Sequence, residues 1–419
     1  MIGNLGLKLR TLAGRPITSA LKRSAAGQLL LVVLSPLLAR LYTPEDFGTY
    51  GLYSNVLGVL VVVASMRLEL AIPSAQSNRD ATLYVMFSLL SSLIFSVLFI
   101  IALSIYSCVF TIYRTDILYY GWVIPLSILV SGPANCLIAW SLHHRQSRSV
   151  GKIFLLQSIQ TATIQVISPL FVNGPIGLLI SLTFGPAGGL FHAGTMWVKR
   201  LRRIDLSIDL MRNTFLKIWH FPVYAVPASL IARMAVHAPV PILFGLYGAE
   251  FAGLVILAQR VIGLPTALFG RVAASFFQQY LGNSLKKKHD ATKGILGITF
   301  LLGSIGGITM IVTIIFAPDF FSLTFGTSWR SAGEAAQILA PMYCMQLVAA
   351  PLSQAQIIAH RMSGQIKVEI IRLLIVCLSI FVPNYFEYSP YYVLGTYSIG
   401  MTLVYALYVL AAFRSARTL

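Results

Sequence analysis

The sequence predicts an all-α polytopic membrane protein, and three observations lead to that prediction. Of its 419 residues, 57% are hydrophobic and only 11% are charged, whereas soluble domains carry about 25% charged residues. The apolar residues come in runs of about 20 or more, and roughly 18 suffice to cross a bilayer. The basic residues, which give a formal net charge of +18, lie mostly between these runs. The charge therefore indicates membrane topology and not a nucleic-acid partner.

Apolar runs that are interrupted by charged or Pro/Gly-rich turns predict about 12 transmembrane helices. The predicted ranges are 20–40, 49–71, 83–108, 118–141, 152–172, 175–198, 218–246, 251–271, 293–316, 334–359, 366–386 and 391–413. All outer loops are predicted to be short, and the longest runs from about Pro318 to Gly333. The four cysteines show no CxxC spacing, so neither a disulfide framework nor a metal site is predicted.

Assigning alternate loops to opposite sides of the membrane gives a strong charge asymmetry. It places 23 of the 31 Lys and Arg residues on the side of both termini, three on the other side and five inside predicted helices. Cytoplasmic loops carry the excess of Lys and Arg in membrane proteins. We therefore expect both termini to be cytoplasmic.

An internal repeat divides the chain. Residues 41–58 can be laid on residues 246–263 at an offset of 205, with Glu and Gly at matched spacing. Chance identity in apolar sequence is the alternative, and the shared Glu and Gly argue against it. The repeat predicts two six-helix lobes, 1–205 and 206–419, which insert in parallel. Parallel repeats build alternating-access carriers, whose substrate site lies in a cavity between the halves.

Three segments carry a resemblance to a known family. They are Arg40-Leu-Tyr-Thr-Pro-Glu-Asp-Phe-Gly-Thr-Tyr with Ala64-Ser-Met-Arg-Leu-Glu-Leu-Ala-Ile-Pro73, Phe244-Gly-Leu-Tyr-Gly-Ala-Glu-Phe-Ala-Gly-Leu-Val-Ile-Leu-Ala-Gln-Arg260, and Leu323-Thr-Phe-Gly-Thr-Ser-Trp-Arg-Ser-Ala-Gly333. In these segments the sequence resembles the polysaccharide biosynthesis flippases, the Wzx-type O-antigen and exopolysaccharide translocases. Those proteins belong to the multidrug/oligosaccharidyl-lipid/polysaccharide exporter superfamily.

The resemblance implies a twelve-helix bundle in two lobes around a central cavity, in a bacterial cytoplasmic (inner) membrane. It implies transport of polyprenyl-diphosphate-linked oligosaccharide to the outer leaflet without a cofactor, driven by a proton or sodium gradient. The implied partners are this glycan, membrane lipids, and a polymerase and chain-length regulator of the same pathway. The sequence departs from the relatives in having few acidic residues inside its helices, so it offers no obvious site for a coupling cation.

Basic residues inside the helices are the candidate substrate site, because a charge at mid-bilayer costs at least ~2.5–3.5 kcal/mol and usually faces a cavity or a partner. Arg233 and Arg260 lie near the middle of sequential helices, and His237 follows Arg233 by four residues on the same helical face. A guanidinium binds a diphosphate with two charge-assisted hydrogen bonds. We predict a cationic midplane site for the substrate from the two arginines, where His237 could extend the polar wall or titrate. Interhelical pairing of the arginines is the alternative.

Arg67 and Arg271 lie near the cytoplasmic ends of their predicted helices, at nearly equivalent repeat positions. They could line the cytoplasmic mouth of the cavity, or they could snorkel to the interface. Arg372 lies three residues from Glu369 on one helical face, so we interpret that pair as structural. No residue is predicted to be catalytic.

Two other function classes compete with a saccharide flippase. A membrane polymerase or ligase needs a substantial outer loop for its acceptor, and no such loop is predicted. A drug exporter of the same superfamily is expected to carry acidic residues in its helices, and this chain has almost none there beyond Glu69 and Glu369. A lipid II flippase usually has fourteen helices and a longer chain. These comparisons favour an anionic lipid-linked substrate.

Overall fold

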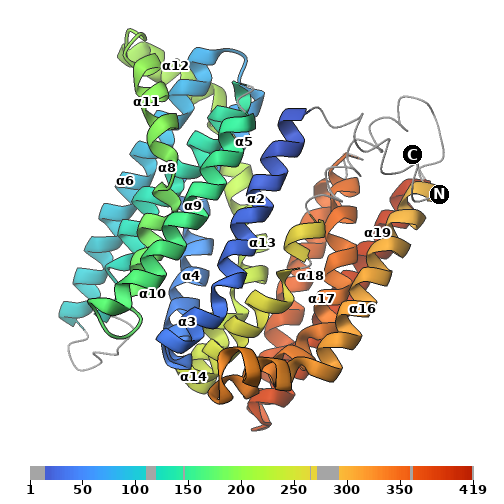
Figure 1. Cartoon of the computed structure of the whole chain (residues 1–419). Helices are drawn as coiled ribbons and strands as arrows, with labels where there is room; N and C mark the ends of the chain where they lie inside the picture. The colour runs from blue at the N-terminus through green and yellow to red at the C-terminus, as the bar shows by residue number, and fades with distance from the viewer. Residues whose placement is uncertain are drawn as a thin grey trace. The chain divides into compact units, whose positions relative to one another are not determined.

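The computed structural model describes residues 15–109, 119–144, 147–264, 266–270, 292–358 and 362–417, and within these ranges the regular structure is entirely helical (Figure 1). The chain divides into two compact units. Unit 1 comprises Met1–Leu31 and Val56–Leu230, and unit 2 comprises Val32–Asn55 and Ile231–Leu419. The unit boundaries differ from those of the lobes predicted from the repeat, 1–205 and 206–419. The arrangement of those lobes stays a prediction.

The helices of unit 1 run along its length as an apolar bundle. They are α2 (Arg15–Val33), α5 (Leu68–Ala71), α6 (Asn78–Val109), α8 (Val123–His143), α9 (Ser147–Ile167), α10 (Ile176–Phe184), α11 (Leu190–Leu201) and α12 (Ile208–Ile218). Those of unit 2 are α3 (Ser35–Leu41), α4 (Pro44–Ala64), α13 (Val226–His237), α14 (Pro239–Ile262), α16 (Thr292–Phe325), α17 (Arg330–Ile358), α18 (Met362–Tyr385) and α19 (Pro390–Arg417). Three of these helices, α2, α4 and α13, cross a unit boundary.

The prediction of an all-α polytopic membrane protein is confirmed. Among the described residues, nine helical stretches are long and apolar enough to cross a membrane. One of them, Ile208–Ile262, contains the predicted seventh helix and the first part of the eighth, which meet at a kink where Gly248 has φ 84°. The predicted sixth helix is divided into α10 and α11, and the eleventh, α18, contains three charged residues. Within the described residues, each of the twelve predicted ranges consists largely of helix.

The second predicted helix, 49–71, is not continuous. α4 ends at Ala64, and Met66 and Arg67 then adopt left-handed conformations with φ 53° and 55° before α5 begins. Non-glycine residues rarely adopt this conformation, which costs of order 1–3 kcal/mol each and persists only where tertiary contacts stabilise it. Because neither residue is Gly or Pro, the sequence carries no local signal for the break.

Two further boundaries differ from the prediction. The sixth helix is interrupted between Phe184 and Leu190, where Gly189 has φ 71° and a Cβ at Gly188 would lie 2.6 Å from the Cα of Gln157. The predicted outer loop from Pro318 is largely helical, since α16 continues to Phe325. Pro318 lacks the N–H that would bond the carbonyl of Ile314, and Gln337 Nε2 donates to that carbonyl at 2.5 Å instead.

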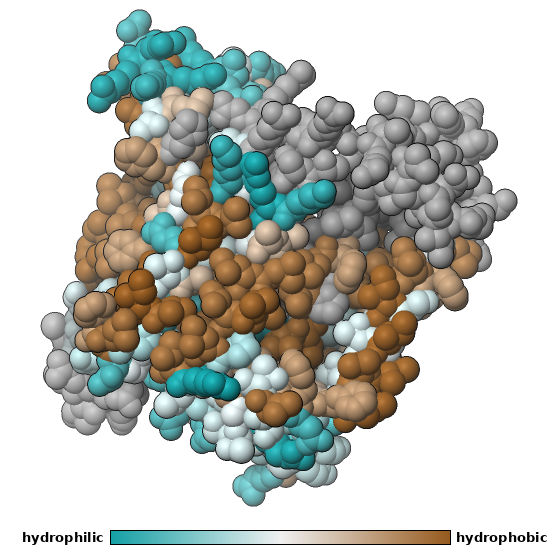
Figure 2. Space-filling model, in the orientation of Figure 1, coloured by the Kyte–Doolittle hydropathy of each residue, from teal (hydrophilic) through white to brown (hydrophobic). Residues whose placement is uncertain are grey.

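The basic end of unit 1 is held together by tryptophans. Trp140 of α8 and Trp197 of α11 both donate to Thr82 of α6, to its hydroxyl at 3.2 Å and its carbonyl at 3.0 Å respectively. The guanidinium of Arg200 lies 5.5 Å from the Trp140 ring. Figure 2 shows hydrophilic side chains gathered over α11 and α12, beyond an apolar surface.

Candidate functional site

In unit 2, α4 and α14 cross with their backbones in contact. A Cβ placed on Gly48 of α4 would lie 1.8 Å from the carbonyl oxygen of Ala249 in α14. A Cβ placed on Gly253 of α14 would lie 1.8 Å from the carbonyl oxygen of Pro44 in α4. Only glycine permits so close an approach, as is common where membrane helices pack through small residues. We call this contact the glycine crossing.

The glycine crossing is made by the internal repeat. Adding the offset of 205 to Pro44 and Gly48 gives Ala249 and Gly253, so each contact is the counterpart of the other. The two repeated segments therefore meet each other reciprocally, as two copies of one element do about a local two-fold axis. This relation was not predicted from the sequence, which gave the repeat but not the contact of its copies.

A polar group lies two helical turns from the crossing. Asn55 of α4 donates from Nδ2 to the Gly51 carbonyl at 2.8 Å, and its Oδ1 lies 2.9 Å from Nδ1 of His237 in α13. Because a carboxamide oxygen only accepts, Nδ1 of His237 carries the hydrogen. The other ring nitrogen, Nε2, is buried without a hydrogen-bond partner among the described residues. Asn55 was not among the predicted site residues, although the offset of 205 aligns it with Arg260.

The two arginines predicted for this site lie in the same unit. Arg233 is exposed on α13, and both it and Arg372 act electrostatically on His237. Arg260 of α14 is half-buried and is influenced by Tyr50 of α4. The structure thus associates Arg233 with His237 and Arg260 with α4. The role of these residues in binding substrate stays a prediction.

Arg67 is held in an ion pair within unit 1. Its Nη1 lies 2.9 Å from Oε1 of Glu69, and its Nε donates to the Ser229 hydroxyl at 2.8 Å. Ser65 donates to the second carboxylate oxygen of Glu69 at 3.2 Å. Residues i and i+2 do not face each other on a helix, so the left-handed break brings this pair together. Arg271, the second residue predicted at the cytoplasmic mouth, lies outside the described residues.

Arg372 is buried in a polar network of unit 2. Its Nη1 lies 3.7 Å from Oε2 of Glu369, its Nη2 donates to Tyr405 at 3.0 Å, and Tyr408 donates to Glu369 Oε1 at 2.6 Å. The predicted pairing of Arg372 with Glu369 is therefore present. It links α18 to α19 and leaves Arg372 matched by a carboxylate.

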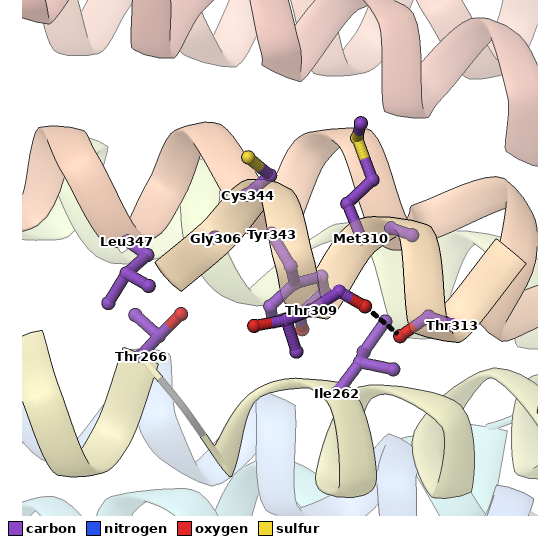
Figure 3. A pocket seen from close by; sticks show the side chains of 10 residues that line it. Ile262, Thr266, Gly306, Thr309, Met310, Thr313, Tyr343, Cys344 and Leu347 are labelled. Atoms are coloured by element: carbon purple, nitrogen blue, oxygen red, sulfur yellow. Dashed lines mark hydrogen bonds between the residues drawn. The ribbon is translucent and has the colours of Figure 1, made fainter. Parts of the chain in front are cut away.

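A small cavity lies elsewhere in unit 2, beside α16 and α17 (Figure 3). Thr309 and Thr313 line it, but their hydroxyls donate to carbonyls of their own helix, at Ile305 and Thr309. The wall is therefore mainly apolar, and it contains no predicted site residue. Within the described ranges, no three His, Cys, Asp or Glu side chains are grouped as metal ligands.

Solved structures share this fold over nearly the whole chain. An inward-facing multidrug resistance MATE family transporter of the MOP superfamily superposes with a TM-score of 0.73 at 15% identity, covering 98% of this chain and 97% of that one. The lipid II flippase MurJ, in an inward closed conformation, superposes with a TM-score of 0.67 at 12% identity, covering 93% of this chain and 87% of that one. A MOP superfamily transporter from Pyrococcus furiosus superposes with a TM-score of 0.57 at 16% identity, covering 98% of this chain and 97% of that one. A search of curated proteins gave no match.

The fold is therefore one that this chain shares with solved MOP superfamily transporters and with the flippase MurJ. A family model described as polysaccharide biosynthesis protein matches residues 37–334, which is well over half of the chain. The chain belongs to that family, as its motifs predicted.

Proposed function

We propose that this transporter moves a polyprenyl-diphosphate-linked oligosaccharide, an O-antigen or exopolysaccharide repeat unit, from the cytoplasmic to the outer leaflet. The observation that carries the proposal is the group of Arg233, His237 and Arg260 inside membrane-spanning helices of a polysaccharide biosynthesis family member. Guanidinium groups bind a diphosphate through paired charge-assisted hydrogen bonds and stay charged at any relevant pH. They supply the partner that an anion needs on leaving the headgroup region.

The acidic residues support an anionic substrate over a cationic drug. Glu69 and Glu369, which lie inside the predicted helices, are each held by an arginine in an ion pair. A carboxylate that is already matched in this way attracts a cationic ligand less strongly. Because these carboxylates are already paired, they do not identify a site for a coupling ion. We propose coupling to a proton or sodium gradient on the family resemblance alone.

The proposal extends to location and partners. We place the protein in a bacterial cytoplasmic membrane with both termini cytoplasmic, because the Lys and Arg residues favour that orientation. A polymerase and a chain-length regulator of the pathway would receive the translocated glycan. The alternative within transport is export of drugs or of lipid II. Lipid II is worth testing as a substrate because the fold is similar to that of the lipid II flippase MurJ.

Reconstitution tests the proposal. Purified protein in proteoliposomes should move a fluorescent polyprenyl-diphosphate-linked disaccharide between leaflets, measured as label that becomes accessible to a membrane-impermeant quencher. Empty liposomes and liposomes containing heat-denatured protein are the controls. Movement of lipid II or of a cationic drug, without movement of the disaccharide carrier, would replace the proposal with the corresponding alternative.

A further inference from the structure

We propose that Asn55 is a substrate-positioning residue, and that Asn55 and Arg260 flank the substrate as equivalent members of the two repeats. The inference rests on the proposed function, and it names how the site is built. It is carried by the glycine crossing and by the hydrogen bonds of Asn55.

The first step is the position of the two residues along their helices. Asn55 follows Gly48 by seven residues, and Arg260 follows Gly253 by seven. Seven residues of α-helix advance about 10.5 Å and return to nearly the same face. Each residue therefore lies at the same depth from the crossing, on the helix face that meets the partner helix.

The second step is the space between the helices. Membrane helices that touch through glycine backbones cross at about 40°, so their axes separate as they run away from the contact. Two turns away, side chains and not backbone atoms lie between the two helix axes, and we infer that the substrate is received there. The electrostatic influence of Tyr50 on Arg260 shows that the arginine lies near α4.

The third step is chemistry. One N–H of the Asn55 amide is used by Gly51 and one lone pair of its oxygen by His237, so one N–H and one lone pair remain. A sugar hydroxyl both donates and accepts, and it matches this remaining pair. Arg260 is an obligate donor with a fixed positive charge, which matches the diphosphate. Arg260 therefore contacts the anionic part of the substrate, and Asn55 contacts its saccharide part.

An exchange of the two side chains tests the inference. Arg260→Asn should slow transport of the disaccharide carrier in proteoliposomes at least tenfold, and Asn55→Arg alone should slow it because it places a second guanidinium at the repeat position equivalent to that of Arg260. The double variant Asn55→Arg/Arg260→Asn restores one cation and one amide at equivalent positions. It should transport at least tenfold faster than Arg260→Asn. A double variant that is folded and no faster than Arg260→Asn would overturn the inference.

A gentler series keeps the test decisive if the exchange variant does not fold. Asn55→Leu should raise the KM for the carrier several-fold with little change in kcat, while Asn55→Gln should recover most of the affinity. The control is Ser54→Ala, whose hydroxyl donates only to its own helix at Gly51 and whose loss should leave KM unchanged. Unchanged KM in Asn55→Leu would refute the positioning role. Wild-type protein that does not move the carrier would instead refute the proposed function itself.

Discussion

Arginines inside the membrane helices of this protein have two kinds of surroundings. Arg67 and Arg372 are each matched by a glutamate, and their ion pairs connect neighbouring segments. Arg233 is exposed on its helix and Arg260 is half-buried beside α4. A charge at membrane depth is costly unless a partner or an aqueous cavity compensates it. The glutamate partners indicate a structural role for the first two arginines, and substrate binding by Arg233 and Arg260 stays a proposal.

Arg233→Ala and Arg260→Ala should each abolish surface polysaccharide, because each removes a diphosphate-binding cation, while the protein stays in the membrane. Glycan staining of intact cells and membrane immunoblots measure the two outcomes. The matched control is Arg330→Ala, since Arg330 is exposed and pairs with an exposed Asp319. Wild-type glycan levels in both site variants would remove these arginines from the site.

His144, just beyond the end of α8, should make the stability of the protein depend on pH. Burial lowers the pKa of His144, and the nearby charges of Arg200 and His143 also lower it. The unfolded chain therefore binds the proton more readily, so stability is lost as the pH falls below about 6.5. The Tm in detergent should fall between pH 7.5 and 5.5, and His144→Gln should reduce that fall. An equal fall in His144→Gln and in wild type would contradict this assignment.

Asn55 shows what the residue pattern could and could not reveal. The repeat was visible in the sequence, and applying its offset to Arg260 would have singled out Asn55. The hydrogen bond from His237 joins residues 182 positions apart, so no local pattern indicates it. A polar side chain in an apolar helix predicts that a hydrogen-bond partner exists. The identity of that partner follows only from the folded structure.

At the scale of elements, hydropathy and turn residues predicted the helices well because membrane spans must satisfy their backbone hydrogen bonds internally. The predicted interruption between 246 and 251 occurs at Gly248, a residue that tolerates positive φ. The break at Met66 and Arg67 was missed because tertiary contacts of Arg67, and not its intrinsic preference, stabilise it. The continuation of α16 past Pro318 depends likewise on a distant side chain, Gln337.

The glycine crossing should be intolerant of a single methyl group. Gly48→Ala and Gly253→Ala each place a Cβ within 1.8 Å of a backbone carbonyl oxygen, so the helices must move apart. Overpacking of this kind typically costs about 1–3 kcal/mol, and the contact here is with rigid backbone. Both variants should show a lower Tm in detergent than wild type.

Gly245→Ala is the matched control for the crossing, because Gly245 lies in the same α14 and has no atom within 4 Å of an added Cβ. It should keep the wild-type Tm or exceed it slightly, since Ala favours helix over Gly by about 1 kcal/mol. If Gly48→Ala and Gly253→Ala behaved like this control, the close approach of α4 and α14 would be wrong.

At the scale of the molecule, the repeat relates function to architecture. Its two copies touch at the glycine crossing, near the start of α4 and just after the Gly248 kink of α14, a region that the charge distribution predicts to face the outer side. The same copies carry Asn55 and Arg260 two turns deeper. If the proposed function holds, a glycan that moves from these residues to the outer leaflet passes the crossing. We therefore expect the crossing to open and close in each transport cycle.

A disulfide across the crossing should stop transport reversibly. A Cβ on Gly51 would lie 2.5 Å from Cγ1 of Ile256, so Gly51→Cys and Ile256→Cys place two sulfurs within bonding reach in a variant without native cysteines. A protease site in the loop after α11 lets a non-reducing gel reveal the bond. Oxidised protein should move the disaccharide carrier at least tenfold more slowly, and reductant should restore the rate.

The two single-cysteine variants separate the bond from the substitutions. Each should transport equally with and without oxidant, because no partner sulfur is available. If the oxidised double variant were fully cross-linked and still moved the carrier at its reduced rate, α4 and α14 would not separate during transport. The substrate path would then have to run past other helices, and Asn55 and Arg260 could not both lie on it.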